Sequence, residues 1–164
     1  MSDPLNALAI RAGRALERKG WRLATAESCT GGWIAKTLTD IPGSSAWLER
    51  GWVSYSNDAK QDMLNVSSDT LIRFGAVSAE TVTEMARGAL ANSRAQVAVA
   101  VSGVAGPDGG SSDKPVGTVW IGWATAQTAT SRHYRFDGDR EAVRRQTVAT
   151  VLGDLPDVIA TKNG

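Results

Sequence analysis

A hydroxyl and a thiol stand next to each other in the segment Thr25–Gly32, which reads TAESCTGG and ends in two glycines. Residues 21–25 are typical of a short strand, and apolar residues recur at helical spacing from residue 33 to residue 40. A strand-to-helix turn with glycines lets backbone N–H groups approach a bound group, and a helix N-terminus favours negative charge. The segment therefore suits a nucleophile or an anion site. It suits equally well a plain helix cap at Thr30 followed by a sharp turn.

A serine nucleophile at Ser28 needs a base, and the chain contains a single histidine, His133. The neighbours of His133 predict a mid-strand position, which does not favour a Ser–His–Asp triad. Lysine is the alternative, because a neutral amine can take the hydroxyl proton. We expect Lys60 in the first turn of a short helix capped by Asn57, where the helix dipole lowers the pKa of a lysine. Tyr55, in the strand before that helix, would relay or orient the proton. A solvated lysine with a long stem is the competing interpretation.

Cys29, directly after Ser28, is the competing nucleophile. Neighbouring side chains generally point in different directions, so the two are not expected to face the same carbonyl group. A buried, inert thiol is the default for this residue. We therefore assign the nucleophile to Ser28.

The most glycine-dense loop of the chain, residues 102–110, follows a stretch over residues 96–101 that is apolar nearly throughout. Such a stretch is typical of a central strand covered on both faces. Ligands collect at the carboxyl ends of strands in α/β sheets, so we expect this loop and the Ser28 turn to face one crevice. Arg140 and Arg144 lie one turn apart on the last predicted helix and would be able to bind an anion. A solvated helix face is the simpler interpretation of these two residues.

The remaining patterns predict further helices and strands around these residues. Helices are expected from Leu5 to Leu16, after Ser67 or Ser68, after Ser78 and after Asp139. Strands are expected over residues 51–56, 115–124 and 131–136, the last two antiparallel. No linker divides the chain, so we predict one domain over residues 1–164. The expected fold class is α/β, a three-layer α/β/α sandwich with a mixed sheet.

Composition argues against several classes of function. The net charge is +1 with no basic run, which does not favour a nucleic-acid partner. No segment approaches the roughly 18 apolar residues of a membrane span, and the N-terminus lacks the pattern of a signal peptide, so we expect a cytoplasmic protein without a membrane partner. One histidine and one cysteine exclude a multi-histidine metal site and an internal disulfide. The P-loop and dinucleotide fingerprints are absent, and we expect no metal and no cofactor.

Six tryptophans leave room for an apolar subunit interface, and a homodimer is the expected assembly. Trp33, Trp47 and Trp52 are the candidates for such an interface. Core packing is the competing explanation for all three.

Six short segments, taken together and in order, resemble the CinA C-terminal domain family. The segments are Ala26–Gly32, Gly43–Ser45, Val53–Asn57, Gly75–Ser78, Ser102–Gly110 and Lys114–Val119. The resemblance runs from about residue 5 to residue 155 and is closest to the stand-alone members, because the chain has no room for the additional N-terminal domain of longer members.

The resemblance implies hydrolysis of the carboxamide of nicotinamide mononucleotide to nicotinate mononucleotide and ammonia, a step that recycles a by-product of pyridine nucleotide metabolism. It implies Ser28 as nucleophile, with Lys60 and Tyr55 as base and proton relay. The substrate-binding residues that we expect are Thr30, Gly31, Gly32, Ser45, Ser102, Gly103, Gly106, Asp108, Gly109, Gly110, Arg140 and Arg145, with Arg144 as a further candidate for the phosphate.

Two questions stay open at the level of the sequence. The turn Thr30–Gly32 would hold either the oxyanion of the reaction or the substrate phosphate. A nucleotide-binding module without catalysis, with a regulatory role linked to DNA uptake, is the alternative function. That module needs the glycine loop and the arginines, whereas the presence of Ser28, Tyr55 and Lys60 together favours an enzyme.

Overall fold

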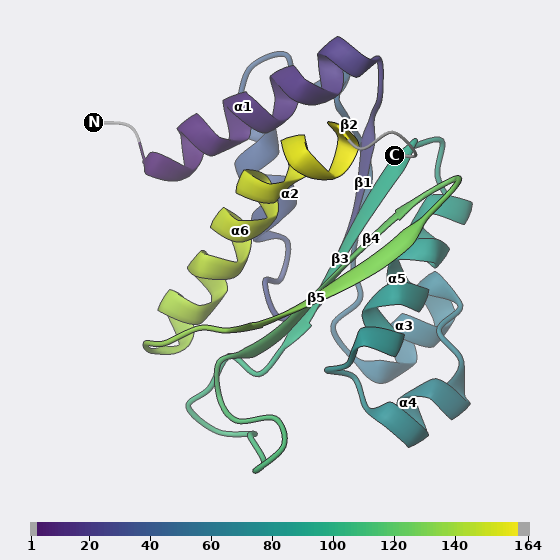
Figure 1. The fold of residues 1–164 in the computed structure, drawn as a ribbon, viewed down its shortest axis with the longest axis vertical. Coiled ribbons are helices and arrows are strands. Elements are labelled where there is room, and N and C mark those ends of the chain that lie inside the picture. Colours follow the sequence, from purple (N-terminus) through teal and green to yellow (C-terminus); the bar gives the residue numbers. More distant parts are fainter. Residues whose placement is uncertain (1–2, 161–164) are drawn as a thin grey trace.

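The computed structural model describes residues 3–160, which form one five-stranded sheet in the order β2-β1-β3-β4-β5 (Figure 1). The strands are β1 (Leu23–Glu27), β2 (Leu48–Val53), β3 (Val97–Gly103), β4 (Thr118–Thr125) and β5 (Ala129–Arg135). Strands β2, β1 and β3 run parallel, whereas β4 and β5 are antiparallel to their neighbours. The predicted mixed sheet is therefore confirmed.

Helices cover both faces of the sheet, as Figure 1 shows. On one face lie α1 (Pro4–Lys19), α2 (Trp33–Thr39) and α6 (Arg140–Ala160). On the other face lie α3 (Asn57–Leu64), α4 (Ser68–Phe74) and α5 (Ala79–Ala91). A short 3₁₀ turn, Ser44–Ala46, precedes β2. These layers form the predicted α/β/α sandwich.

The central strands divide their side chains between two hydrophobic cores. In β3, Val97, Val99 and Val101 belong to the core beneath α1, α2 and α6, while Ala98 and Ala100 belong to the core beneath α3, α4 and α5. Successive side chains of a strand point to opposite faces, so one strand contributes to both cores. The small alanines also let α5 approach the sheet closely.

Helix caps follow the predicted chemistry at most positions. Ser67, Ser78 and Asp139 accept hydrogen bonds from backbone N–H groups of the helices that follow them. The prediction of Asn57 as the cap of α3 was wrong, because Ser56 is the cap and its hydroxyl accepts from the N–H of Ala59 at 3.0 Å. Asn57 is instead the first residue of that helix.

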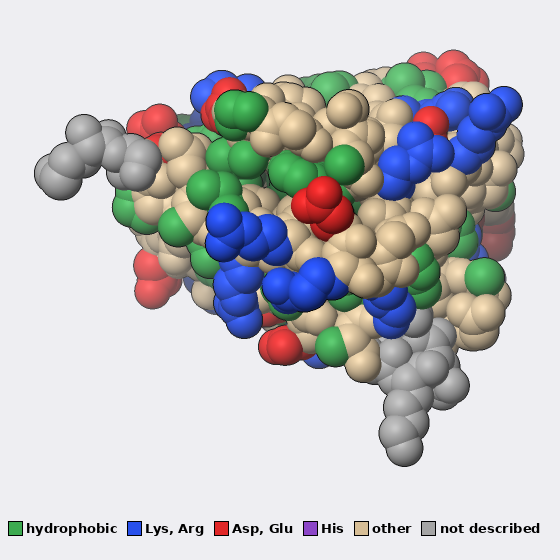
Figure 2. All heavy atoms as spheres, turned by 90° about the horizontal axis from the view of Figure 1, so that it is seen from above, with side chains coloured by type: hydrophobic (Ala, Val, Ile, Leu, Met, Phe, Trp, Pro, Cys, Tyr) green, Lys and Arg blue, Asp and Glu red, His purple; other side chains and the backbone are tan. Residues whose placement is uncertain are grey.

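The outer face of α1 is polar, as its periodicity predicts. Arg11, Arg14, Glu17 and Arg18 are exposed, and the inward residues of the helix are buried. Figure 2, which looks down on the α1 side of the molecule, shows basic, acidic and apolar side chains interspersed over this face. Within residues 3–160, no helix combines the length and hydrophobicity that crossing a membrane requires.

The three candidate interface tryptophans pack against the cores. Trp47 is buried over Gly13, where an added Cβ would lie 2.5 Å from the indole ring. Trp33 and Trp52 are half-buried, each against a different core. Core packing therefore accounts for Trp47, and the homodimer stays a prediction.

Candidate active site

A pocket of about 240 Å³ lies at the carboxyl ends of the three parallel strands. Ser28 follows β1 directly, Ser102 and Gly103 end β3, and Ala105 begins the glycine-rich loop. Helix α3 adds Lys60, and further lining residues are Cys29, Tyr55, Asn57, Ala76, Val77 and Arg140. The expectation that the Ser28 turn and the loop after residue 101 face one crevice is confirmed.

Ser28 and Lys60 meet in this pocket. Lys60 Nζ lies 3.0 Å from Ser28 Oγ, 3.1 Å from the carbonyl oxygen of Ser54 and 2.9 Å from the carbonyl oxygen of Tyr55. A neutral amine has two N–H donors and one lone pair. The two carbonyl oxygens can accept both donors, which leaves the lone pair for the serine hydroxyl.

Burial favours that neutral state of the lysine. Lys60 is 1% exposed, and desolvation lowers the pKa of its ammonium group below the ordinary value. The competing interpretation of a solvated lysine was therefore wrong. The dyad consists of a serine hydroxyl and an amine whose charge is disfavoured by its surroundings.

Tyr55 contributes to the dyad through its backbone. Its carbonyl oxygen accepts from Lys60 Nζ and lies 3.3 Å from Ser28 Oγ as a second acceptor. Its side chain is 59% exposed, and its hydroxyl accepts from Arg140 Nη2 at 3.4 Å. The proton relay predicted for this hydroxyl stays a prediction.

Glu27 fixes the turn that presents Ser28, a role that the sequence analysis missed. The carboxylate is 1% exposed and accepts from Thr30 Oγ1 at 2.5 Å, from the N–H of Ile34 at 2.8 Å and from the N–H of Ala35 at 3.0 Å. It therefore ties the end of β1 to the start of α2. A glutamate placed between an apolar strand and a Thr-Gly-Gly turn was the signal available in the sequence.

Arg144 holds the same turn from the side of α6. Its Nε donates to the carbonyl oxygen of Cys29 at 2.9 Å, and its Nη2 donates to that of Thr30 at 3.1 Å. The backbone closes the turn as well, because the N–H of Gly31 donates to the carbonyl oxygen of Ser28 at 3.1 Å. Ser28 thus sits on a rigid support.

Cys29 lines the pocket as a protonated thiol. Burial, together with the nearby charge of Glu27, raises the pKa of Cys29 to about 12. A thiolate is the reactive form of cysteine, so this thiol is inert at neutral pH. The expectation of a buried thiol is confirmed.

Arg140 reaches the pocket from the first position of α6. Its Nη1 donates to the carbonyl oxygen of Gly106 at 2.8 Å, which joins the helix to the glycine-rich loop. No carboxylate among residues 3–160 forms an ion pair with its guanidinium. An unpaired cation at a pocket wall is an available partner for an anionic group.

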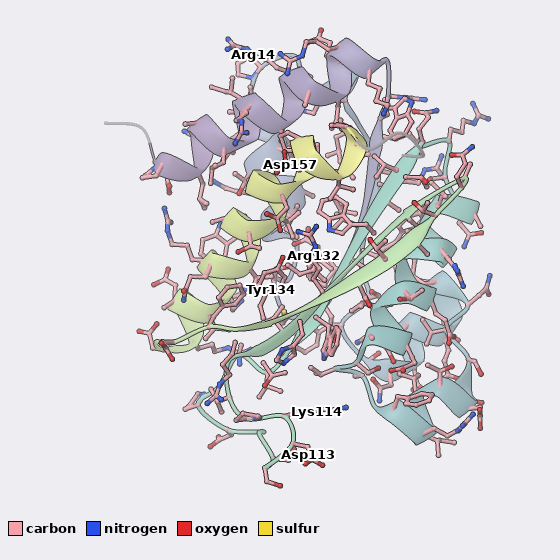
Figure 3. All side chains as sticks on the ribbon, viewed as in Figure 1. Arg14, Asp113, Lys114, Arg132, Tyr134 and Asp157 are labelled. Atoms are coloured by element: carbon pink, nitrogen blue, oxygen red, sulfur yellow. The ribbon has the colours of Figure 1, made fainter. Side chains whose placement is uncertain are left out.

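Other residues predicted to bind substrate lie outside this pocket. Thr30, Gly31, Gly32 and Arg145 line a neighbouring hollow between α2 and α6, and Arg145 is ion-paired with Asp3. Asp108, Gly109 and Gly110 are exposed in the glycine-rich loop. That loop ends near Asp113 and Lys114, labelled in Figure 3, and the Lys114 ammonium donates to the carbonyl oxygen of Phe74.

Ser45, also predicted to bind substrate, lies at the other end of the parallel strands from Ser28. Ser45 precedes β2, at the edge where the parallel strands begin, whereas Ser28 follows the opposite end of β1. The role of Ser45 in substrate binding stays a prediction, as do the roles of the loop residues. His133 lies on β5, separated from β1 by β3 and β4, which agrees with its exclusion from a triad. Within residues 3–160 there is no cluster of three or more His, Cys, Asp or Glu side chains suited to a metal ion.

Comparison with known proteins identifies similar sequences. The family model described as CinA C-terminal domain matches residues 5–159. The chain is 56% identical to the nicotinamide-nucleotide amidohydrolase PncC of Escherichia coli K12 over 149 residues, which cover 90% of each protein. It is 56% identical to PncC of Pseudomonas putida over 153 residues, which cover 93% of this chain and 96% of that relative.

Two solved structures match the fold of this chain over nearly its whole length. The competence/damage inducible protein CihA from Agrobacterium tumefaciens matches with a TM-score of 0.92 and 46% identity, covering 97% of this chain and 98% of that one. A CinA superfamily protein from Klebsiella pneumoniae matches with a TM-score of 0.93 and 40% identity, covering 96% of this chain and 99% of that one.

Proposed function

The chain belongs to the CinA C-terminal domain family and is an amidohydrolase, and we propose that its substrate is nicotinamide mononucleotide, hydrolysed to nicotinate mononucleotide and ammonia. The observation that carries the mechanism is the buried Lys60 amine, 3.0 Å from Ser28 Oγ with two carbonyl acceptors around it. This arrangement supports a serine nucleophile activated by a neutral lysine.

The proposed reaction has two halves. Ser28 Oγ attacks the carboxamide carbon while Lys60 Nζ takes the hydroxyl proton. The resulting ammonium donates a proton to the leaving nitrogen, the C–N bond breaks, and ammonia departs from an acyl ester on Ser28. Water then attacks the ester, Lys60 accepts the proton of that water, and Ser28 leaves with its proton restored.

The oxyanion of the tetrahedral intermediate needs N–H donors beside Ser28. The N–H of Gly31 already donates to the carbonyl oxygen of Ser28, so the remaining candidates of the turn are the N–H groups of Cys29, Thr30 and Gly32. Cys29 lines the pocket and follows the nucleophile directly, the position that supplies such a donor in other serine hydrolases. We assign the main oxyanion contact to the Cys29 N–H.

Arg140 is the proposed partner of the substrate phosphate. Its guanidinium is unpaired by any carboxylate within residues 3–160, and it joins the glycine-rich loop to the wall that contains Tyr55. A phosphate bound there would leave the carboxamide end of the nucleotide directed toward Ser28. Tyr55, with its hydroxyl beside Arg140, would help to orient both groups.

Ammonia release from nicotinamide mononucleotide tests this function. We expect turnover by the wild type in excess chelator, and loss of turnover by about 10²–10⁴-fold in both Ser28→Ala and Lys60→Met, because each removes one partner of the proton transfer. Lys19→Met is the matched control, since Lys19 lies at the end of α1, outside the pocket, where its ammonium contacts the carbonyl oxygen of Ile159 and the Trp21 ring.

Two results would contradict the proposal. Undiminished turnover by folded Ser28→Ala would remove the serine from the mechanism. A folded wild type that binds the nucleotide without releasing ammonia would point to the non-catalytic binding module instead.

A further inference from the structure

A second hollow, of about 590 Å³, lies on the far side of the Ser28 turn from the catalytic pocket. We call it the α2–α6 hollow, since Trp33 and Lys36 of α2 and Arg144 and Arg145 of α6 line it together with Gly31. None of these residues lines the catalytic pocket. The hollow therefore has no part in the proposed hydrolysis as described above.

Arg144 is held in the hollow with one edge of its guanidinium unused. Nε and Nη2 donate to the carbonyl oxygens of Cys29 and Thr30, and the guanidinium carbon lies 5.7 Å from the centre of the Trp33 ring. Nη1 has no hydrogen-bond acceptor, and the guanidinium has no carboxylate partner, among residues 3–160. A half-buried, fixed and unpaired guanidinium is preorganised to bind phosphate or carboxylate oxygens.

The hollow is lined by charges of both signs, with one more positive than negative. Lys36 and Arg145 add two positive charges, whereas Asp3 and Glu141 add two negative ones, so the lining has a net positive charge with Arg144 included. Asp3 is already ion-paired with Arg145. Lys36 is ion-paired with Asp40, which does not line the hollow. Among residues 3–160, the lining charges without an ion-pair partner are therefore those of Arg144 and Glu141.

Gly31 keeps the space beside this guanidinium open. Its φ is +61°, and an added Cβ would lie 3.3 Å from Arg144 Nη2, closer than ordinary contact. Trp33 offers a flat apolar surface next to the same group, which suits a nucleobase. The hollow therefore combines the Arg144 guanidinium, open space beside Gly31 and the aromatic surface of Trp33.

We propose that the α2–α6 hollow is a second ligand site, which binds a phosphate monoester through Arg144 and Lys36, with a nucleotide base against Trp33. Because Arg144 also holds the carbonyl oxygens of Cys29 and Thr30, a ligand there acts on the support of Ser28. The site is separate from the phosphate contact proposed for Arg140.

Adenosine 5′-monophosphate is a suitable probe, since it has a phosphate and a base but no carboxamide to hydrolyse. Calorimetric titration of the wild type should show two bound equivalents. Arg140→Gln should lose the equivalent in the catalytic pocket, and Arg144→Gln should lose the one in the hollow. Binding is measured without turnover, so this test is independent of the ammonia assay.

Lys36→Glu keeps the proposal testable if Arg144→Gln disturbs the turn. This charge reversal at an exposed position also removes the ion pair of Lys36 with Asp40, and it should weaken the hollow site by about tenfold or more, the scale of a lost charged hydrogen bond, while leaving the other equivalent unchanged. Arg14→Glu is the matched control, because Arg14 lies on the outer face of α1 and is labelled there in Figure 3. It should retain both equivalents with wild-type affinities.

Inorganic phosphate, titrated in the same way, separates the two sources of the phosphate group. Adenosine monophosphate binding at least tenfold tighter in the hollow would assign it to a nucleotide, and equal affinity would assign it to free phosphate; both results support a phosphate site. A single equivalent in the wild type that is lost in Arg140→Gln and retained in Arg144→Gln would overturn the proposal, whereas a single equivalent lost only in Arg144→Gln would support the hollow and contradict the phosphate contact of Arg140. Two unchanged equivalents in both Arg144→Gln and Lys36→Glu would also overturn the proposal.

Discussion

Lys60 combines two properties that rarely occur in one lysine. Its amine is almost fully buried, yet every neighbour within hydrogen-bonding distance is an oxygen that can accept from it: two carbonyl groups and one hydroxyl. When the lysine is protonated, all three oxygens can accept, and the Ser28 hydroxyl can turn its own proton toward the carbonyl oxygen of Tyr55. When the lysine is neutral, the serine hydroxyl becomes the donor. The protonation state of one amine therefore decides which way the serine proton points.

This dependence gives a prediction for the pH profile. Burial lowers the pKa of Lys60, and the proposed mechanism requires the neutral amine, so kcat should rise with pH through that lowered pKa and then level off. Steady-state rates measured on a phosphate-free pH series would show the rising limb. A rate that is flat, or that falls over the same range, would contradict a lysine base.

The lowered pKa of Lys60 also makes the free energy of unfolding depend on pH. Between the lowered pKa of folded Lys60 and its ordinary value in the unfolded chain, the unfolded state binds more protons, so the free energy of unfolding should rise with pH in that window. Below the window Lys60 is protonated in both states, and the cost of burying its charge is fully present; above the window the amine is neutral in both states, and that cost is absent. Lys60→Met should lose this part of the slope, whereas Lys19→Met should keep it.

At the residue scale, the sequence singled out the two side chains that meet in the pocket, but not the residues that support them. Ser28 and Lys60 stood out because a hydroxyl and a lysine occupied special positions, one on a glycine turn and one near a helix start. Glu27 acts through three hydrogen bonds to Thr30, Ile34 and Ala35, and no pattern in the sequence specifies those partners. A pattern of residue types also does not predict that the Tyr55 side chain points toward Arg140.

At the scale of elements, α3 is held in place by a contact between backbones. Gly88 of α5 packs against the C-terminal end of α3, where an added Cβ would lie 1.9 Å from the carbonyl oxygen of Leu64 and 2.7 Å from its carbonyl carbon. Backbone atoms cannot rotate away as a side chain can. Any side chain at position 88 therefore moves α3, and α3 carries Lys60.

Gly88→Ala should consequently reduce both stability and activity. We expect a loss of about 1–3 kcal/mol in the free energy of unfolding, as for an overpacked core, and a fall in kcat approaching 10²-fold, because a shift of about 1 Å in Lys60 spoils its approach to Ser28. Denaturant titration and the ammonia assay measure the two effects. Gly153→Ala in α6 is the control, since an added Cβ there would meet no heavy atom within 4 Å beyond its chain neighbours and the adjacent backbone of its own helix. Equal behaviour of the two variants would argue against this contact.

The order and type of the elements were predictable, and their ends less so. Strand β1 was expected over residues 21–25 and spans Leu23–Glu27, so the strand continues up to Ser28 itself. The apolar pattern specifies a strand but not its last hydrogen bond, which depends on pairing with β2 and β3. The cap of α3 lies one residue earlier than expected for a similar reason. Both Ser56 and Asn57 are good caps, and the tertiary position of the chain selects between them.

At the scale of the whole molecule, two hydrophobic cores share one sheet. Alternate residues of β1 and β3 enter opposite cores, as Val99 and Ala100 do, so neither core can separate without breaking strand pairs that support the other. The catalytic pocket draws on elements from both faces, with Lys60 on α3 and Arg140 on α6. The integrity of the site therefore depends on both cores at once.

This arrangement predicts cooperative unfolding. Leu152 is fully buried in the core beneath α1, α2 and α6, and Met85 is fully buried in the core beneath α3, α4 and α5. Leu152→Ala and Met85→Ala should each lower the free energy of unfolding by about 2–5 kcal/mol, through lost burial and a residual cavity. Because the strands are shared, urea transitions followed by tryptophan fluorescence and by far-ultraviolet circular dichroism should coincide in both variants, with unchanged m-values. Transitions that separate in Met85→Ala while coinciding in the wild type would mean that the α5 side unfolds alone, in which case Lys60 would leave the site before the rest of the sheet is lost.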